Sequence, residues 1–224
     1  GERVLFRSKD SGVYFGVSKI KCNSLDDTNF VYEIDGVVVP SPSVAKVGNL
    51  SPDFVLEEIN GGWHALSDFR GKTVVIEWFS ADCPFSGKSS RRSVHSNGTV
   101  LKTKEGVSKI LGDKNFIYLT INSTANKKEQ QVRSSTKLSM KEWNITTPML
   151  MDYSGYAGKR FGARTTPHMF VVSPEGILVY RGAICDREDL SKNHVVNAVK
   201  LLHNGEKVLP NEVKPWGCGV KYAK

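Results

Sequence analysis

The feature that most constrains the fold of this chain is an apolar run that leads directly to a cysteine–proline pair. Residues 72–79 read KTVVIEWF, and Cys83 and Pro84 follow after three further residues. Such a run is typical of a strand buried on both faces of a sheet. Proline is favourable at the first position of a helix, because its missing N–H has no partner there. The pattern therefore predicts a central strand that delivers Cys83 to the start of a helix beginning at Pro84.

A cysteine at the start of a helix is suited to nucleophilic chemistry. The helix dipole and the free backbone N–H groups at that end favour the thiolate over the thiol. The thiolate is the attacking species in thiol–disulfide exchange. Cys83 is therefore the candidate nucleophile, and the alternative interpretation is a small buried cysteine at the end of a strand.

A second proline stands immediately before another apolar strand. Residues 165–172 read TTPHMFVV, so Pro167 would open that strand. Proline cannot donate to a β-ladder, and a cis peptide bond in a tight turn is one explanation for its presence there. We therefore predict a cis-proline loop at Thr166 and Pro167.

The remaining pattern predicts alternating strands and helices followed by a hairpin, which indicates an α/β domain with a mixed sheet. Further strands are expected at 54–58, 63–66, 116–122, 168–173 and 176–181, and helices at 100–111, 126–140, 153–161 and 190–204. Two β-prone runs, 13–22 and 30–40, precede this domain. The chain is thus divided into an N-terminal β-rich extension (1–47), an α/β domain (48–205) and a tail that carries Cys218 (206–224).

Three segments together resemble the redoxin branch of the thioredoxin superfamily, which includes TlpA/ResA-like and AhpC/TSA-like proteins. They are SPDF at 51–54, DCPF at 82–85 and TTPHMF at 165–170. The resemblance implies a thioredoxin-like fold over 48–205, with a mixed central sheet flanked by helices. The segment GCGVKY at 217–222 makes the chain similar to a subgroup of exported bacterial redoxins, which carry one cysteine at the helix start and another in a C-terminal tail.

The resemblance also implies the roles of the reactive residues. Cys83 attacks, and Glu77, six residues earlier, occupies the place of a buried acid that moves protons. Cys218 is the possible resolving thiol. Ser86 stands where a C-x-x-C motif has its second cysteine, so it cannot close a disulfide but can donate its hydroxyl to the thiolate.

The substrate groove is expected to form between two loops. Thr166 and Pro167 shape one side, as the cis-proline loop of this superfamily does, and Pro84 and Phe85 lie on the other. Trp216, beside the tail cysteine, is expected either to hold the tail against the domain or to pack without a redox role. The remaining histidines are expected on the surface: His64, His95, His194 and His203.

These residues predict a thiol–disulfide oxidoreductase that acts on protein thiols or disulfides and needs no cofactor. A thiol peroxidase is one alternative, because Ser80 fits P-x-x-x-T/S-x-x-C, although Ile76 replaces its proline. Another is a copper-binding protein with Cys83 and His168 as candidate ligands. Gly87 then stands where copper chaperones of the Sco type have their second cysteine. An adaptor whose redox site has decayed is the last alternative.

Charge and composition limit the partners. The formal net charge is +8, but lysine and arginine are spread along the chain, which favours a solvated basic surface over nucleic-acid binding. No apolar run approaches the roughly 20 residues that span a bilayer, so membrane association is not indicated. The similarity to exported redoxins predicts an extracytoplasmic location, where Cys22 and Cys185 would form a disulfide or remain two buried thiols. Glycosylation sequons occur at Asn49, Asn97, Asn122 and Asn144.

Overall fold

A computed structural model of the chain describes residues 42–88 and 90–223, together with the backbone of four short strands before them. These strands are β1 (Phe6–Arg7), β2 (Tyr14–Phe15), β3 (Val31–Ile34) and β4 (Val37–Pro40). β1 pairs with β2 and β3 pairs with β4, both antiparallel. The rest of the predicted extension lies outside the described residues, as does Cys22, so the boundary at residue 47 and the pairing of Cys22 stay predictions.

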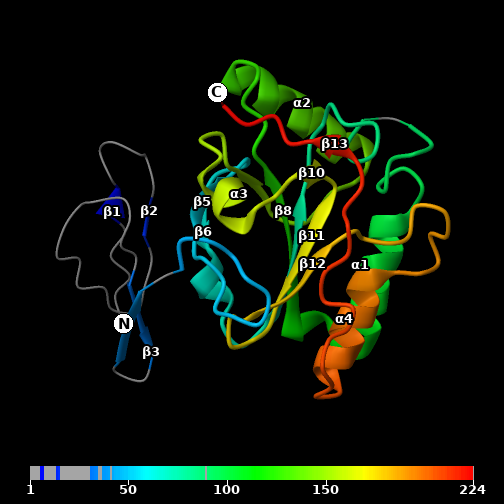
Figure 1. Cartoon of the computed structure of the whole chain (residues 1–224). Coiled ribbons are helices and arrows are strands. Elements are labelled where there is room, and N and C mark those ends of the chain that lie inside the picture. The colour runs from blue at the N-terminus through cyan, green and yellow to red at the C-terminus, as the bar shows by residue number, and fades with distance from the viewer. Residues whose placement is uncertain are drawn as a thin grey trace.

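Seven strands form one mixed sheet (Figure 1). β7 (Thr73–Trp78) lies between β11 and β8 and is buried along its whole length, as the apolar run predicts. β7, β8 and β9 are parallel, whereas the other neighbours are antiparallel. In spatial order the sheet contains β12 (Leu178–Gly182), β11 (His168–Val172), β7, β8 (Phe116–Asn122), β9 (Met149–Met151), β5 (Val55–Glu58) and β6 (Trp63–Ala65).

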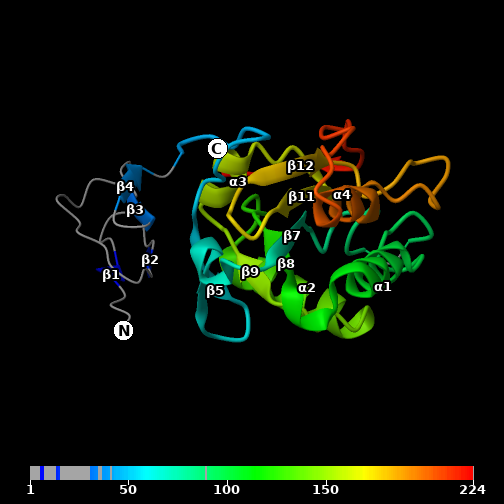
Figure 2. The ribbon, with the colours of Figure 1, turned by 90° about the horizontal axis from the view of Figure 1, so that it is seen from below.

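Helices cover both faces of this sheet. Figure 2 shows α1 (Thr99–Leu111), α2 (Glu129–Glu142) and α4 (His194–His203) on one face and α3 (Tyr156–Phe161) on the other. Of two short 3₁₀ turns, η1 (Leu66–Phe69) joins β6 to β7 and η2 (Asp113–Asn115) joins α1 to β8. These elements confirm the predicted α/β architecture. No helix in the described part is both long and apolar enough to cross a membrane.

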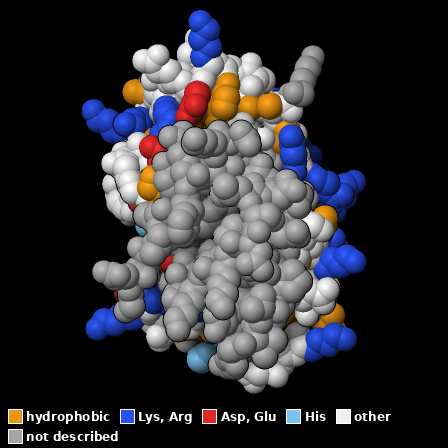
Figure 3. All heavy atoms as spheres, turned by 90° about the vertical axis from the view of Figure 1, so that its left-hand side faces the viewer, with side chains coloured by type: hydrophobic (Ala, Val, Ile, Leu, Met, Phe, Trp, Pro, Cys, Tyr) orange, Lys and Arg blue, Asp and Glu red, His pale blue; other side chains and the backbone are white. Residues whose placement is uncertain are grey.

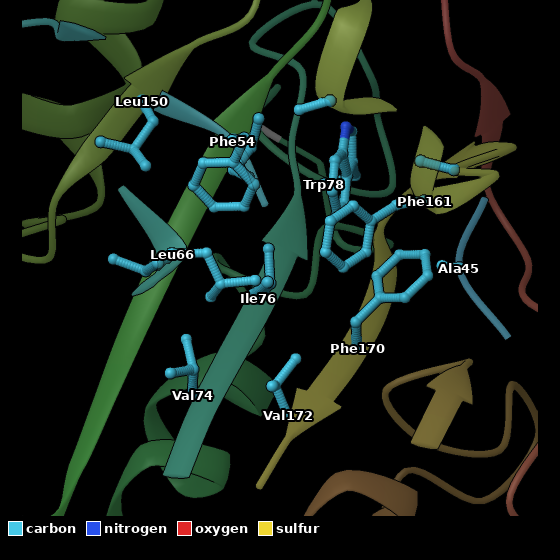
Figure 4. Packing of buried hydrophobic residues seen from close by; sticks show 14 of the residues in the cluster. Ala45, Phe54, Leu66, Val74, Ile76, Trp78, Leu150, Phe161, Phe170 and Val172 are labelled. Carbon is cyan, nitrogen blue, oxygen red and sulfur yellow. The ribbon is translucent and has the colours of Figure 1, made fainter. Parts of the chain in front are cut away.

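An aromatic cluster fixes the end of β7 from which the chain continues toward Cys83. Trp78 packs between Phe161 of α3 and Phe170 of β11, with ring centroids 5.4 and 5.0 Å away (Figure 4). All three rings are fully buried. The Trp78 indole N–H donates to Ser123 Oγ over 3.0 Å, so its polar atom is also satisfied. The strand end is therefore held rigidly before the turn that carries the reactive cysteine.

A buried acid at the start of α3 predicts a pH-dependent stability. Asp152 accepts hydrogen bonds from Ser123 Oγ (2.6 Å) and from the backbone N–H groups of Ala157 and Gly158. Burial nevertheless raises the pKa of Asp152 to about 6. A raised folded-state pKa contributes stability below the unfolded pKa, and this contribution is lost as the pH rises through about 6.

We therefore expect Asp152→Asn, which cannot ionise, to destabilise the protein less at high pH than at low pH. The gap in unfolding free energy between wild type and variant should narrow by about 2 kcal/mol from about pH 4.5 to about pH 7.5. Urea unfolding at the two pH values measures it. A gap that is the same at both would contradict burial as the dominant influence on Asp152.

The predicted helix beginning at Pro84 is wrong. Residues 84–98, apart from Ser89, form successive turns, and α1 begins only at Thr99. Only a single helical-type turn follows the cysteine, in which the backbone N–H of Ser86 donates to the Cys83 carbonyl over 3.0 Å. Cys83 therefore does not gain the dipole of a long helix.

The packing of Gly87 explains why the helix does not form. A Cβ on Gly87 would lie 2.3 Å from the Phe79 ring, so this position is pressed against the strand end. Its carbonyl accepts hydrogen bonds from Ser139 Oγ (2.9 Å) and Trp143 Nε1 (3.1 Å) of the α2 region instead of from a helical N–H. Glycine is also a poor helix former. Tertiary contacts therefore override the favourable proline at position 84.

Candidate active site around Cys83

The predicted partners Cys83 and the cis-proline loop do meet. The Cys83 thiol is 2% exposed and donates a hydrogen bond to the Thr166 carbonyl over 2.9 Å. The Thr166–Pro167 peptide bond is cis. The backbone N–H of Phe85 points at Cys83 Sγ from 3.4 Å, which is a favourable position for a donor to a thiolate. Cys83, the predicted nucleophile, thus lies between the two loops that the sequence predicts.

The tail completes the site in a way that its irregular sequence does not indicate. β13 (Cys218–Gly219) pairs antiparallel with β10 (Thr165–Thr166), and Cys218 stands opposite Thr166 in the register. The Val220 N–H continues the contact to the Arg164 carbonyl over 3.0 Å. In Figure 1 the red tail runs up from α4 to lie beside β10. Cys218 and Cys83 therefore reach the same short strand, one by backbone pairing and the other by its thiol.

Gly217 makes this close approach possible. A Cβ at this position would lie 2.3 Å from the Thr166 carbonyl oxygen, and the residue has a φ of +142°. Only glycine meets both requirements without strain. Gly219, on the other side of Cys218, has no such constraint, because its nearest neighbour would be 3.9 Å away.

Two aromatic residues hold the tail on either side of Cys218. Trp216 donates from Nε1 to the Cys185 carbonyl over 2.9 Å, and its ring meets the Phe85 ring edge-on at 6.0 Å. Tyr222 donates from its hydroxyl to the Ala163 carbonyl over 2.7 Å. The structure thus supports the first alternative for Trp216, that it holds the tail against the domain.

The thiol of Cys218 is kept protonated. Burial, followed by the hydrogen bond with the Cys83 thiol and the charge of that group, raises the pKa of Cys218 to about 11. Lys221 acts in the opposite direction. Both cysteines are free thiols in the structure, and so is the buried Cys185, whose pKa burial raises to about 11. The two thiols of the candidate site thus interact, and burial beside Cys83 disfavours ionisation of Cys218.

Ser86 lies where predicted but does not meet a partner. It is fully buried, and within the described part of the chain its hydroxyl has no hydrogen-bond partner. The hydroxyl of Thr166 is buried and unpartnered in the same way. Buried hydroxyls usually find a partner, so two orphaned ones next to the nucleophile are unusual. The role of Ser86 as a donor to the Cys83 sulfur stays a prediction.

Glu77 is fully buried, as predicted, but its partners are other than the cysteines. It accepts hydrogen bonds from His95 Nε2 (3.0 Å) and from the Tyr118 hydroxyl (2.8 Å). Burial and then the charge of Glu77 raise the pKa of Tyr118 well above its ordinary value. No hydrogen bond in the described residues joins Glu77 to Cys83 or Cys218. Its role in proton transfer stays a prediction.

The sequence prediction for His95 is wrong. Its side chain is only 5% exposed, and it contacts the Phe79 ring edge-on at 5.5 Å as well as Glu77. Local sequence gives no signal for this, because His95 belongs to a polar turn segment that the fold brings over β7. A buried acid in the strand, which needs a donor, is the only sequence feature that could have pointed to it.

His168, a candidate copper ligand, is held by structural contacts. Its Nδ1 accepts from the Arg164 N–H over 3.2 Å, and its ring packs on Phe170 at 4.5 Å. Burial, with the charges of Arg164 and Arg181, lowers the pKa of His168 to about 3. Among residues 42–88 and 90–223, no three histidine, cysteine, aspartate or glutamate side chains are grouped to hold a metal ion.

Ser80, the candidate peroxide-site residue, has a structural partner. Its hydroxyl accepts from Thr124 Oγ1 over 3.2 Å, and its carbonyl accepts from the backbone N–H groups of Cys83 (3.2 Å) and Gly87 (3.0 Å). Ser80 therefore closes the turn that carries Cys83. Phe85, in the same turn, is half-buried beneath Arg92 and Arg187, whose guanidinium carbons lie 6.0 and 5.7 Å from its ring centroid.

A mixed sheet flanked by helices, with a cysteine after the central strand facing a cis-proline loop, defines a thioredoxin-like fold. The chain belongs to the AhpC/TSA family, whose sequence profile matches residues 47–181. This confirms the predicted redoxin branch, whereas the exported subgroup stays a prediction.

Solved structures share this fold at low sequence identity. A hypothetical protein from Sinorhizobium meliloti is 23% identical, with a TM-score of 0.66, and the match covers 80% of this chain and 95% of that one. An uncharacterized conserved protein from Geobacillus kaustophilus is 21% identical, with a TM-score of 0.63 and coverage of 80% and 93%. A candidate protein disulfide isomerase from Bacteroides thetaiotaomicron is 15% identical, with a TM-score of 0.52 and coverage of 75% and 94%. No curated protein matches the chain.

Proposed function

We propose that this protein is a thiol–disulfide oxidoreductase in which Cys83 attacks and Cys218 resolves. One observation carries the proposal: the tail strand places Cys218 opposite Thr166, whose carbonyl accepts the hydrogen bond of the Cys83 thiol. The absence of a second cysteine at Ser86 is thereby compensated by a residue more than a hundred positions later. Family membership supports a redoxin-type activity.

The reaction proceeds in two exchanges. The Cys83 thiolate attacks one sulfur of a protein disulfide, so a mixed disulfide forms and the other substrate sulfur leaves as a thiolate. The Cys218 thiolate then attacks Cys83 Sγ, which forms the Cys83–Cys218 disulfide and releases the second substrate thiol. Two electrons pass to the substrate, and both protons lost by the enzyme are taken up by the released thiols. The reverse sequence oxidises a substrate dithiol.

Peptide mapping under non-reducing conditions tests the pair. Oxidation of the reduced protein should link Cys83 to Cys218, and both Cys83→Ser and Cys218→Ser should abolish turnover of a peptide disulfide. Cys185→Ser is the matched control, because Cys185 is a buried thiol outside the pair, and it should retain turnover. A crosslink that involves Cys185 instead, or full activity of Cys83→Ser, would disprove the assignment.

The resolving step should depend steeply on pH. Cys218 must ionise to attack, and burial, the largest cause of its raised pKa, keeps the thiolate fraction small at neutral pH. We expect the rate of resolution of a preformed mixed disulfide on Cys83 to rise by up to about tenfold per pH unit between about pH 7 and pH 9. Stopped-flow release of a chromogenic thiol measures this rate. A rate that does not change with pH would show that a step other than Cys218 ionisation limits resolution.

A thiol peroxidase is a second candidate, favoured by the unpartnered hydroxyls of Ser86 and Thr166 near a nearly inaccessible Cys83. Cys83 would break the O–O bond of a hydroperoxide, forming a sulfenic acid and water or an alcohol. The Cys218 thiol would then attack the sulfur of this sulfenic acid, which releases water and gives the same disulfide.

Dimedone labelling of Cys218→Ser after addition of hydrogen peroxide separates the two activities. Rapid stoichiometric labelling at Cys83 would favour the peroxidase. Exchange with disulfides in the absence of such labelling would favour the oxidoreductase. We further propose that the protein works outside the cytoplasm, because its tail segment 217–222 is similar to that of exported bacterial redoxins.

A further inference from the structure

The tail, residues 216–222, docks along a strip of the protein surface, called the track below, which also contacts side chains of the tail. Trp216, two residues before Cys218, packs on Phe85 and donates to the Cys185 carbonyl. Tyr222, four residues after it, donates to the Ala163 carbonyl. Between these anchors Cys218 pairs through its backbone with Thr166, and the Val220 side chain packs against the hydrophobic core.

Two glycines leave the space that the Tyr222 side chain occupies. A Cβ on Gly158 would lie 2.5 Å from the Tyr222 hydroxyl oxygen, and one on Gly155 would lie 2.6 Å from its ring. Any other residue at these two positions would close the seat. At the other end of the track the half-buried Phe85 supplies an aromatic surface for Trp216. The surface is therefore shaped for an aromatic group at each end.

The backbone between the seats is equally well defined. The edge of β10 offers the Thr166 carbonyl and the Arg164 carbonyl, which the Cys83 thiol and the Val220 N–H occupy. Beyond them the Lys221 carbonyl accepts from the Ala125 N–H over 2.7 Å. The residue before the cysteine must be glycine, because a Cβ there would collide with the Thr166 carbonyl. The track thus fixes the register of the strand that it binds and requires one glycine and two aromatic side chains in it.

We propose that this track is a peptide-binding site and that residues 216–222 are a built-in copy of what it binds. The partner is an extended polypeptide segment with glycine before a cysteine, an aromatic residue two positions before it and another four positions after it. The inference rests on the proposed function, because the bound cysteine exchanges with Cys83. In the resting protein the tail itself occupies the track, so a partner must displace it to reach the buried thiol.

A synthetic peptide of the sequence KPWGCGVKYA, which is that of residues 214–223, tests this site. Its cysteine is activated as a mixed disulfide with 2-thiopyridine. Cys83 attacks the peptide sulfur, the S–S bond to thiopyridine breaks, and thiopyridone leaves with the electron pair and is detected optically. The protein is the full chain with Cys218→Ser, so that the peptide stays attached to Cys83.

Three results are expected. The peptide should react at least about tenfold faster than the same peptide with alanine in place of both aromatic residues. Valine in place of the glycine before its cysteine should slow it by a similar factor. Adding Trp216→Ala to the protein should weaken the docked tail and raise the rate with the unchanged peptide about tenfold. Trp63→Ala is the matched control, because it removes a 36% exposed aromatic side chain of the edge strand β6. It should leave the rate of reaction with the peptide unchanged.

Reaction with 2,2′-dipyridyl disulfide separates the two possible failures. If Cys83 reacts with this small disulfide but treats all three peptides alike, the recognition site is wrong and the proposed function stands. If Trp216→Ala leaves the peptide rate unchanged, the tail does not compete for the track, which also overturns the inference. If Cys83 reacts with neither reagent in the folded protein, the proposed function fails.

Discussion

Changing Gly217 to alanine should slow formation of the Cys83–Cys218 disulfide by at least about a hundredfold. The added Cβ would lie 2.3 Å from the Thr166 carbonyl oxygen, which belongs to backbone and cannot move aside. The φ of +142° adds strain for any residue with a side chain. The tail would leave β10, and Cys218 would then encounter Cys83 only as the end of a flexible tether. The rate is measured by quenching an oxidation time course and separating the crosslinked form.

Gly219→Ala is the matched control for this prediction. It adds the same methyl group one residue after Cys218, where the nearest atom would be at an ordinary 3.9 Å. Its disulfide should form at nearly the wild-type rate. Equal slowing by both substitutions would mean that the tail tolerates no methyl group at all and that the Thr166 contact is not the cause. No slowing by Gly217→Ala would mean that the pair forms without the β10–β13 pairing.

Changing Trp78 to alanine should lower the free energy of unfolding by about 3–5 kcal/mol. The side chain is fully buried and joins β7 to Phe161 and Phe170, so its removal leaves a cavity at the centre of one face of the sheet. Ser123 Oγ would also lose the indole donor. For a chain of this size the midpoint of thermal unfolding should fall by roughly 2–4 °C per kcal/mol. Denaturant titration and calorimetry measure the two quantities.

Two further variants separate the reasons for this loss. Trp78→Phe keeps most of the volume and removes the N–H, so about 1–2 kcal/mol of the effect should remain. Leu138→Ala, at a position of α2 that is 70% exposed, should change stability by less than about 0.5 kcal/mol. A loss in Trp78→Phe as large as that in Trp78→Ala would assign the effect to the hydrogen bond with Ser123 instead of to packing.

Most of the sheet could be predicted because the mostly apolar composition of its longer strands is visible in the sequence. β7, β8 and β11 are mostly apolar segments of five to seven residues bounded by polar or proline-containing segments. The four helices after residue 98 were likewise predicted, at 100–111, 126–140, 153–161 and 190–204. β9 was not predicted, because three residues are too short to show a period. The helix at Pro84 was predicted wrongly because the position of Gly87 is set by Phe79 and α2, which lie elsewhere in the sequence.

The residues of the candidate site could likewise be predicted only in part. Cys83, Thr166 and Pro167 could be found because local chain geometry gives a cysteine or a proline at a strand end a meaning of its own. The tail cysteine was found only through resemblance. Its pairing with β10 has no signature in a two-residue strand. His95 was missed, since its burial depends on how the turn segment 84–98 packs over β7, which composition does not reveal.

The pairing of β10 with β13 has a consequence for the order in which the protein folds. All seven strands of the sheet, and β10 itself, precede the tail in the chain, so the sheet can assemble before the last strand arrives. Until the tail docks, Cys83 lacks the neighbouring thiol of Cys218, with which it is hydrogen-bonded in the folded protein. Synthesis from the N-terminus therefore completes the cysteine pair only with the last strand.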